Sequence, residues 1–214
     1  MRWTIFVWVV LVVLGPVLAF AARGAGPLPG DLALSRLFQQ PLPDGLVGYL
    51  LVRASNVVWL LSPLAILVTL LVRQWLAAAF ILLASSTGVL VGVVIKVLVA
   101  RPRPTADLVR LYDSPESYSF PSTTAFFAAT FLGMVGYLAW QPRRRVGIVM
   151  LGILLLLSSG LSRVYVGAHW ATDVLGGWLL GGAWLLVLIA LYRWWLVRGP
   201  KAGAPTRRRR RARR

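Results

Sequence analysis

The sequence predicts an all-α, polytopic membrane protein in which six transmembrane helices form a bundle. Its 214 residues are 58% hydrophobic and only 14% charged, which is too apolar for a soluble domain of this length. The charged residues are also spaced so that long apolar runs lie between them. A spanning helix needs about 20 mostly apolar residues, and the runs are of about that length.

Six intervals without a charged side chain are each about long enough to cross a bilayer. They run from Arg2 to Arg23, Arg53 to Arg73, Arg73 to Lys96, Glu116 to Arg143, Arg145 to Arg163, and Asp173 to Arg193. Pro63 and Gly88 lie inside two of them, but membrane helices tolerate both residue types. We therefore expect one transmembrane helix in each interval.

The first interval has a competing interpretation as a signal peptide. Ala19, Phe20 and Ala21 resemble a signal-peptidase site that follows an apolar core. Arg2 is the whole of the basic region before that core, however, and the apolar run has spanning length. We favour a retained helix, and both alternatives leave the rest of the topology unchanged.

A short segment from Asp31 to Gln40 lies between two proline-containing turns, after the first predicted helix. It contains four large apolar residues, Leu32, Leu34, Leu37 and Phe38. Asp31 is of a type that can cap a helix, so we expect a brief helix lying along the membrane surface.

Basic residues outnumber acidic ones by 23 to 6, and many of them lie in residues 201–214. Such a tail could bind nucleic acid, but we favour a cytoplasmic segment that fixes topology and attracts anionic headgroups. Placing both termini in the cytoplasm also puts Arg73 and Arg143 to Arg145 there. We expect residues 1–200 to form a single membrane-embedded domain, residues 201–214 to be a basic cytoplasmic tail, and no nucleic acid to be a partner.

Three polar clusters then fall on the predicted extracytoplasmic side. The first contains Lys96, Arg101 and Arg103, with two prolines that stiffen the exit from the third helix. One such basic residue alone would merely mark the membrane boundary. Together, a lysine and two arginines form a compact set of anion donors, and arginine suits planar contacts to phosphate oxygens.

The second cluster runs from Ser119 to Thr124, immediately before the fourth predicted helix. Pro121 and Ser122 are ordinary residues for a helix start. A helix N-terminus with free backbone N–H groups and hydroxyls is also an anion site, so the capping and binding interpretations are compatible.

The third cluster, Ser162 to Asp173, contains the only histidine of the chain, His169. If the chain is helical from Trp170 onward, His169 and Asp173 lie one turn apart on one face. The carboxylate could then accept a hydrogen bond from one imidazole nitrogen and present the other as a nucleophile. A lone histidine in a membrane helix is more often structural, but this carboxylate and Arg163 upstream favour a functional site.

The order and spacing of these residues resemble the type-2 phosphatidic acid phosphatase superfamily. The resemblance spans residues 96–173 and lies in K-x(6)-R-P at Lys96, Arg103 and Pro104, P-S at Pro121 and Ser122, and S-R-x(5)-H-x(3)-D at Ser162, Arg163, His169 and Asp173. It implies six helices and an extracytoplasmic site in a bacterial plasma membrane protein. The implied activity is a membrane-bound phosphatase for a lipid phosphate or diphosphate, such as phosphatidic acid or undecaprenyl diphosphate.

The resemblance also implies a role for each site residue. His169 would be the nucleophile that forms a phosphohistidine, and Asp173 would orient it. The residues that would hold the phosphate oxygens are Lys96, Arg103, Ser122, Thr123 and Arg163. The implied partners are the phosphorylated lipid substrate and membrane lipids.

No metal ion or other cofactor is expected. The chain contains no cysteine, which excludes thiolate metal sites, thiol nucleophiles and disulfides. One histidine and six carboxylates along the chain leave little from which to build a two-metal hydrolase site.

The middle motif departs from the family at Thr124. Members of the family normally have P-S-G-H or P-S-T-H there, and that histidine donates a proton to the leaving alkoxide. A general acid contributes ~10²- to 10⁴-fold, so we expect monoester cleavage to be impaired and remaining activity to favour diphosphate or otherwise activated substrates. Asp113 or Glu116 would replace the acid only if buried enough to stay protonated.

Two other interpretations remain open at this point. One is a catalytically degenerate relative that binds or moves lipid phosphates without hydrolysing them, and the other is a purely structural membrane protein.

Overall fold

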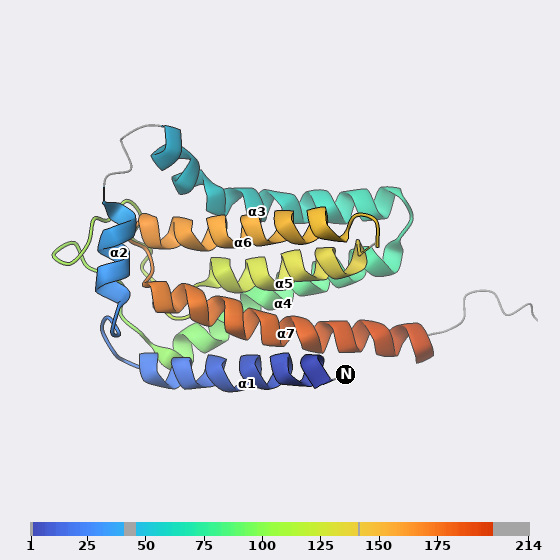
Figure 1. Cartoon of the computed structure of the whole chain (residues 1–214), viewed down its shortest axis with the longest axis horizontal. Helices are drawn as coiled ribbons and strands as arrows, with labels where there is room; N and C mark the ends of the chain where they lie inside the picture. Colours follow the sequence, from blue (N-terminus) through green and yellow to red (C-terminus); the bar gives the residue numbers. More distant parts are fainter. Residues whose placement is uncertain (1, 41–45, 141, 199–214) are drawn as a thin grey trace, which may run out of the picture.

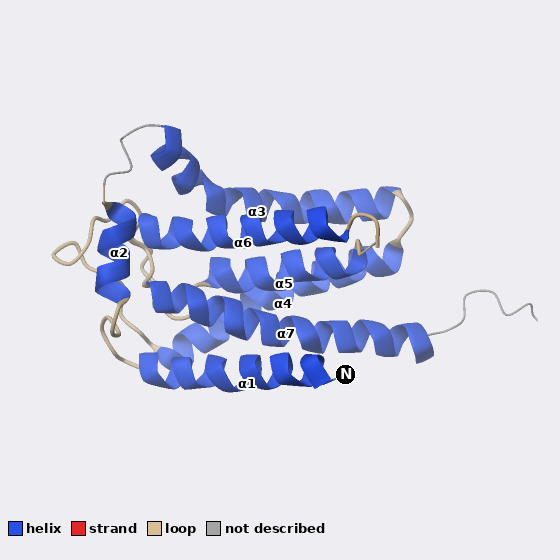
Figure 2. Ribbon diagram, viewed as in Figure 1, coloured by secondary structure: helices blue, strands red, loops and turns tan. Residues whose placement is uncertain are grey.

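The structure, a computed structural model, describes residues 2–40, 46–140 and 142–198 and contains only helices within them. In chain order these are α1 (Arg2–Ala22), α2 (Asp31–Gln39), α3 (Leu46–Leu71), α4 (Trp75–Val99), α5 (Thr123–Leu138), α6 (Arg145–Tyr165) and α7 (Ala171–Arg198). The long helices run side by side as a bundle, and the short helix α2 lies across one end of it (Figure 1, Figure 2). The predicted all-α class is confirmed for this part of the chain.

Each predicted transmembrane interval contains one long helix, but the helices differ in how well they meet the criteria for spanning. Within the described ranges, four are long and apolar enough to cross a membrane: Val52–Leu71, Trp75–Val99, Arg145–Tyr165 and Ala171–Arg198. The apolar parts of α1 and α5, Phe6–Ala22 and Thr123–Leu138, are shorter. The protein is therefore a multi-pass membrane protein, and six crossings remain a prediction.

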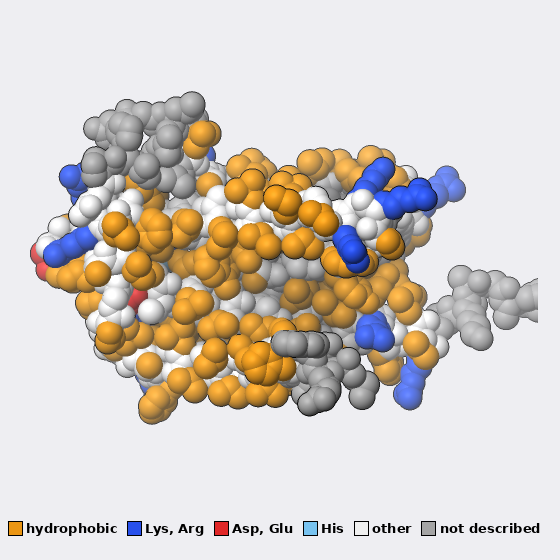
Figure 3. Space-filling model, viewed as in Figure 1, with side chains coloured by type: hydrophobic (Ala, Val, Ile, Leu, Met, Phe, Trp, Pro, Cys, Tyr) orange, Lys and Arg blue, Asp and Glu red, His pale blue; other side chains and the backbone are white. Residues whose placement is uncertain are grey.

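Large apolar side chains cover the sides of the bundle (Figure 3). Phe20, Leu60 and Leu71 are among many that are mostly exposed. In water such a surface would aggregate, whereas it suits contact with lipid chains. Basic side chains gather at the end of the bundle away from α2, where Arg73 and Arg145 lie at the ends of long helices.

Helix α5 is buried in the bundle, where it packs against α4, α6 and α7. Two glycines of α7 permit its close approach: a Cβ added at Gly177 would lie 2.8 Å from the carbonyl oxygen of Ser122, and one at Gly181 would lie 2.7 Å from that of Phe126. Small residues allow membrane helices to pack backbone against backbone in this way. The N-terminus of α5 is thereby held beside the first turns of α7.

The predicted surface helix exists as α2, but its start and its orientation differ from expectation. Its N-cap is Gly30, which adopts the left-handed conformation that glycine tolerates, and no side chain caps it. The side chains buried on α2 are polar, Asp31, Ser35 and Gln39, whereas Leu34 and Leu37 are 41% and 60% exposed. Asp31 is therefore a buried residue that faces the end of the bundle, not the N-cap.

The two ends of the chain bear on the predicted domain limits. Helix α1 packs along α7 and also contacts α4. That this segment is retained and not cleaved stays a prediction. The predicted basic tail, residues 201–214, lies outside the described residues.

Candidate active site

His169 lies at the end of the bundle that α2 covers, in the short connection between α6 and α7. The helix expected from Trp170 begins one residue later, at Ala171. The imidazole is almost completely buried, at 3% exposure. Its Nδ1 lies 3.6 Å from Oδ2 of Asp173, and its Nε2 lies 3.3 Å from Nη1 of Arg103. The structure thus brings the predicted pair together, at a separation slightly beyond hydrogen-bond range.

Burial determines the charge of this imidazole. It lowers the pKa of His169 to about 3; the nearby Asp173 carboxylate offsets part of this effect, and the cations Arg103 and Lys96 add to it. The ring is therefore neutral around pH 7, and one of its two nitrogens is unprotonated. The ring nitrogen Nδ1 is buried and has no hydrogen-bond partner.

Arg103 approaches the histidine from the connection between α4 and α5, residues 100–122, named the outer connection. Its Nη1 donates to the carbonyl of Ala168, and its Nη2 donates to Oγ of Ser117 at 3.1 Å. Burial lowers the pKa of Arg103 to about 10, and the positive charge of Arg163 adds to the shift. The guanidinium still carries its charge at neutral pH, fixed beside the imidazole.

Lys96 and Arg163 complete a group of three cations. Lys96 lies buried in the last turn of α4, where Arg103 and Arg163 repel its ammonium group and Asp173 attracts it. Arg163 lies in the last turn of α6, and its Nε is buried without a hydrogen-bond partner. Cations that repel one another in this way favour the binding of a multiply charged anion.

Asp113 is the carboxylate that pairs with Arg163 in this group. Its Oδ2 accepts a hydrogen bond from Nη2 of Arg163 at 2.7 Å, and its side chain is 45% exposed. Glu116 is exposed as well. Neither carboxyl group is buried, so the burial that a replacement general acid would require is absent.

The N-terminus of α5 supplies the middle cluster. Ser122 is its N-cap: the hydroxyl accepts from the backbone N–H of Ala125 at 3.4 Å, and the Ser122 N–H donates to the carbonyl of Asp173 at 3.0 Å. Thr123 and Thr124 follow in the first turn, and Thr124 is 9% exposed. The N–H groups of a first turn have no acceptor within their own helix, so this end attracts an anion.

Arg101 does not belong to the cation group with which its sequence position associates it. Its side chain is fully buried, with Nη1 2.6 Å from Oδ1 of Asp173 and Nη2 2.7 Å from Oδ2 of Asp31. The prediction that Arg101 joins the anion donors is therefore wrong. Two carboxylates already occupy its guanidinium, whereas Arg103, two residues further on, faces the histidine.

Asp173 has more partners than the sequence suggested. Its Oδ2 accepts hydrogen bonds from the backbone N–H of Trp170 at 2.8 Å and from Oγ of Ser119. Ser119 lies within the predicted middle cluster, and its hydroxyl donates to the Asp173 carboxylate. No local pattern in the sequence indicates this contact, because it joins residues that are 54 positions apart.

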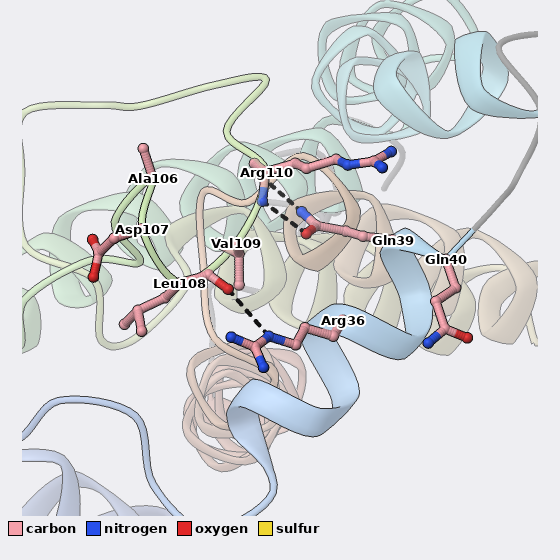
Figure 4. A pocket seen from close by; sticks show the side chains of 8 residues that line it. All are labelled: Arg36, Gln39, Gln40, Ala106, Asp107, Leu108, Val109 and Arg110. Carbon is pink, nitrogen blue, oxygen red and sulfur yellow. Dashed lines mark hydrogen bonds between the residues drawn. The ribbon is translucent and has the colours of Figure 1, made fainter.

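The outer connection is fastened to the bundle by α2. Nε2 of Gln39 donates to the carbonyls of Arg110 and Tyr165, at 2.8 and 2.9 Å, and its Oε1 accepts from the N–H of Arg110 at 3.0 Å. Figure 4 shows this amide directed at the backbone of Arg110, while Arg36 reaches the carbonyl of Leu108. Between α2 and this segment lies an open groove of about 410 Å³.

Comparisons with known proteins identify the family. The PAP2 superfamily matches residues 74–196. The chain is 31% identical over 148 residues to an undecaprenyl-diphosphatase of Sulfolobus acidocaldarius, covering 68% of each protein. It is 30% identical over 179 residues to phosphatidylglycerophosphatase B of Bacillus subtilis, covering 77% of this chain and 84% of that protein.

Two solved structures share the fold. One is a transmembrane PAP2 type phosphatidylglycerolphosphate phosphatase from Bacillus subtilis, with a TM-score of 0.75 and 23% identity over 87% of this chain and 96% of that one. The other is LpxE of Aquifex aeolicus, with a TM-score of 0.60 and 22% identity over 75% and 94% of the two chains. The matched region contains all three polar clusters, and the chain belongs to the PAP2 superfamily.

Proposed function

We propose that this protein is a membrane-bound phosphatase that hydrolyses a lipid phosphate or diphosphate. The single observation that carries the proposal is the neutral, buried His169 with Arg103 at its Nε2, in a group of three cations. The relatives named as an undecaprenyl-diphosphatase and a phosphatidylglycerophosphatase support a phosphorylated lipid as the substrate. Membership of the superfamily supports hydrolase chemistry.

In the proposed mechanism, Nε2 of His169 attacks phosphorus. A bond forms between Nε2 and phosphorus, the bond from phosphorus to the leaving oxygen breaks, and water later hydrolyses the phosphohistidine. The proton on Nδ1 faces Oδ2 of Asp173, which stabilises the positive charge that develops on the ring.

Lys96, Arg103 and Arg163 would hold the phosphate oxygens, together with Ser122, Thr123 and the first N–H groups of α5. The negative charge on these oxygens is stabilised by cations that are already in place, so the protein need not reorganise during the step. This chemistry uses side chains and backbone groups of the chain alone.

Thr124 limits the choice of leaving group. A threonine hydroxyl is too weak an acid to protonate a departing alkoxide, and Asp113 and Glu116 are exposed. When the terminal phosphoryl group of a diphosphate lipid is transferred, the leaving group is the lipid monophosphate, which needs much less protonation than an alkoxide. We therefore infer that diphosphate lipids are better substrates than monoesters.

The site is proposed to face the extracytoplasmic side. Arg73, Arg143, Arg144 and Arg145 lie at the helix ends away from α2, and such residues are retained in the cytoplasm. The opposite end, which carries His169, would then contact the outer leaflet.

The second candidate is a protein that binds or moves lipid phosphates without hydrolysis. It rests on Thr124, at the position where the resemblance of the middle motif implies a general-acid histidine. In that case the cation group would bind the phosphate of the lipid, but the bond from phosphorus to the leaving oxygen would not be broken.

Phosphate release from the purified protein in detergent tests the proposal. Undecaprenyl diphosphate and phosphatidic acid are compared, with His169→Ala as the control. If the protein is a phosphatase, phosphate release should be faster from the diphosphate than from phosphatidic acid, and His169→Ala should abolish it. Release from neither lipid, with vanadate still bound, would favour the binding protein.

A further inference from the structure

Asp31 is a fully buried carboxylate in α2 that the proposed reaction does not use directly. Its Oδ1 accepts from the backbone N–H of Thr172 at 2.9 Å, and its Oδ2 accepts from the Thr172 hydroxyl at 2.8 Å. The same Oδ2 also accepts from the N–H of Leu28 at 2.9 Å. These contacts attach the start of α2 to the first turn of α7, which carries Asp173.

Arg101 lies between Asp31 and Asp173 and contacts both. All three side chains have no exposed surface, and the two ion pairs are 2.7 and 2.6 Å long. Nη1 of Arg101 also donates to the Thr172 hydroxyl at 2.8 Å, and Nη2 donates to the carbonyl of Gly26 at 2.8 Å. Because its donors are occupied on several sides, the guanidinium has one well-defined position.

This position determines how Asp173 faces the histidine. Arg101 holds Oδ1, so that Oδ2 points toward Nδ1 of His169, 3.6 Å away. Buried charges are stable only when each is paired and hydrogen-bonded. Without the Asp31 charge, the Arg101 guanidinium would lose one of its two ion pairs and could shift. Asp173 would then lose its fixed orientation.

We propose that Asp31 is a positioning residue: it fixes Arg101, Arg101 fixes Asp173, and Asp173 orients the His169 imidazole. The catalytic site therefore depends on α2, a helix outside the region that matches the family, residues 74–196. This role rests on the proposed function, since it acts on the nucleophile assigned there.

The main variant is Asp31→Asn, which removes the charge but keeps the size and one acceptor oxygen. Asp107→Asn is the matched control, since Asp107 is an exposed carboxylate in the outer connection. Thr172→Val is a milder variant that keeps all the charges and removes the hydroxyl between Arg101 and Asp31. It carries the test if Asp31→Asn does not yield folded protein, which a melting curve in detergent would reveal.

The readouts separate orientation from binding. Phosphate release from undecaprenyl diphosphate gives kcat and KM, inhibition by inorganic phosphate reports the cation group, and vanadate affinity reports the transition-state geometry. A lost charged hydrogen bond predicts a kcat lower by about 10-fold or more in Asp31→Asn, and by about 3-fold in Thr172→Val. KM and phosphate affinity should stay within about 2-fold of the parent, because no phosphate ligand has changed.

Two results would overturn the positioning role. One is a kcat in Asp31→Asn equal to that of Asp107→Asn. The other is a parallel loss of kcat, phosphate affinity and melting temperature, which would indicate general destabilisation. If the parent releases no phosphate, the proposed function has failed, and the role of Asp31 is decided by vanadate: a weakened affinity for vanadate with unchanged affinity for phosphate supports it, and equal affinities refute it.

Discussion

Gly167→Ala is the substitution whose effect on the site follows most directly from the geometry. Gly167 precedes His169 by two residues and has a φ of +74°. A Cβ added there would lie 2.2 Å from the carbonyl oxygen of Arg110 in the outer connection. The methyl group therefore creates backbone strain and a collision with a neighbouring backbone.

Gly24 separates these two effects. Its φ is +62°, but an added Cβ would meet nothing within 4 Å. Each substitution should cost about 1–2 kcal/mol of unfolding free energy for the left-handed conformation. In Gly167→Ala the methyl group must also be brought from 2.2 Å to an ordinary contact distance of at least 3.4 Å, so one backbone must move by about 1 Å.

That movement would displace His169 or the Asp113–Arg163 pair, because residues 110–113 pack against residues 166–167. A misplacement of about 1 Å can cost ~100-fold in rate. Phosphate release and thermal unfolding are therefore measured for both variants. We expect kcat/KM to fall about 100-fold in Gly167→Ala and to stay near the parent value in Gly24→Ala. Equal activities in the two variants would refute the contact between the α6–α7 connection, which carries His169, and the outer connection.

Three further predictions concern the site. Thr124→His should raise phosphatidic acid hydrolysis by ~10²- to 10⁴-fold and diphosphate hydrolysis much less, as measured by phosphate release against Thr124→Asn; no gain would mean that another group already serves as the acid. Arg101→Met leaves two buried carboxylates, Asp31 and Asp173, without their cation, and should cost about 3–5 kcal/mol of unfolding free energy in denaturant titration, whereas a loss below ~1 kcal/mol would contradict the buried triad. The pKa of His169 is lowered from 6.5 to about 3, so between these pH values the unfolded chain binds a proton that the folded chain does not. The melting temperature should therefore fall as the pH drops below 6.5 towards 3. The same dependence of the melting temperature on pH in His169→Gln would rule out this contribution.

The helix positions were predictable because charge is costly inside a bilayer. Arg73 and Arg145 lie next to helix ends, as the charge-free intervals indicated. Arg53 is an exception, since α3 begins earlier, at Leu46, and continues through it. A charged residue marks the limit of the apolar environment, whereas a helix ends only where its backbone hydrogen bonds end.

The proximity of His169 and Asp173 was predictable because it is local. His169 and Asp173 are four residues apart at the start of a helix, and this spacing alone brings them together. The family motifs then associate Lys96, Arg103 and Arg163 with the same site, and the structure gathers them at one end of the bundle. Thr124 as a replaced general acid stays a prediction.

The support of that pair could not be read from the sequence. Arg101 contacts Asp31 and Asp173, which are 70 and 72 positions away, and no spacing rule connects them. Asp31 also resembled a helix cap, since aspartate is common at that position. Only the folded arrangement of α2 across the bundle shows that its polar face is the buried one.

Trapping of a phosphoenzyme tests the central claim most directly. The protein is mixed with undecaprenyl diphosphate labelled in its terminal phosphate, quenched during turnover in base, and digested to locate the label. We predict an acid-labile, base-stable phosphate on the peptide that contains His169, and no label in His169→Ala. Label on a different residue, or phosphate release by His169→Ala at the parent rate, would contradict the assignment of His169 as the nucleophile.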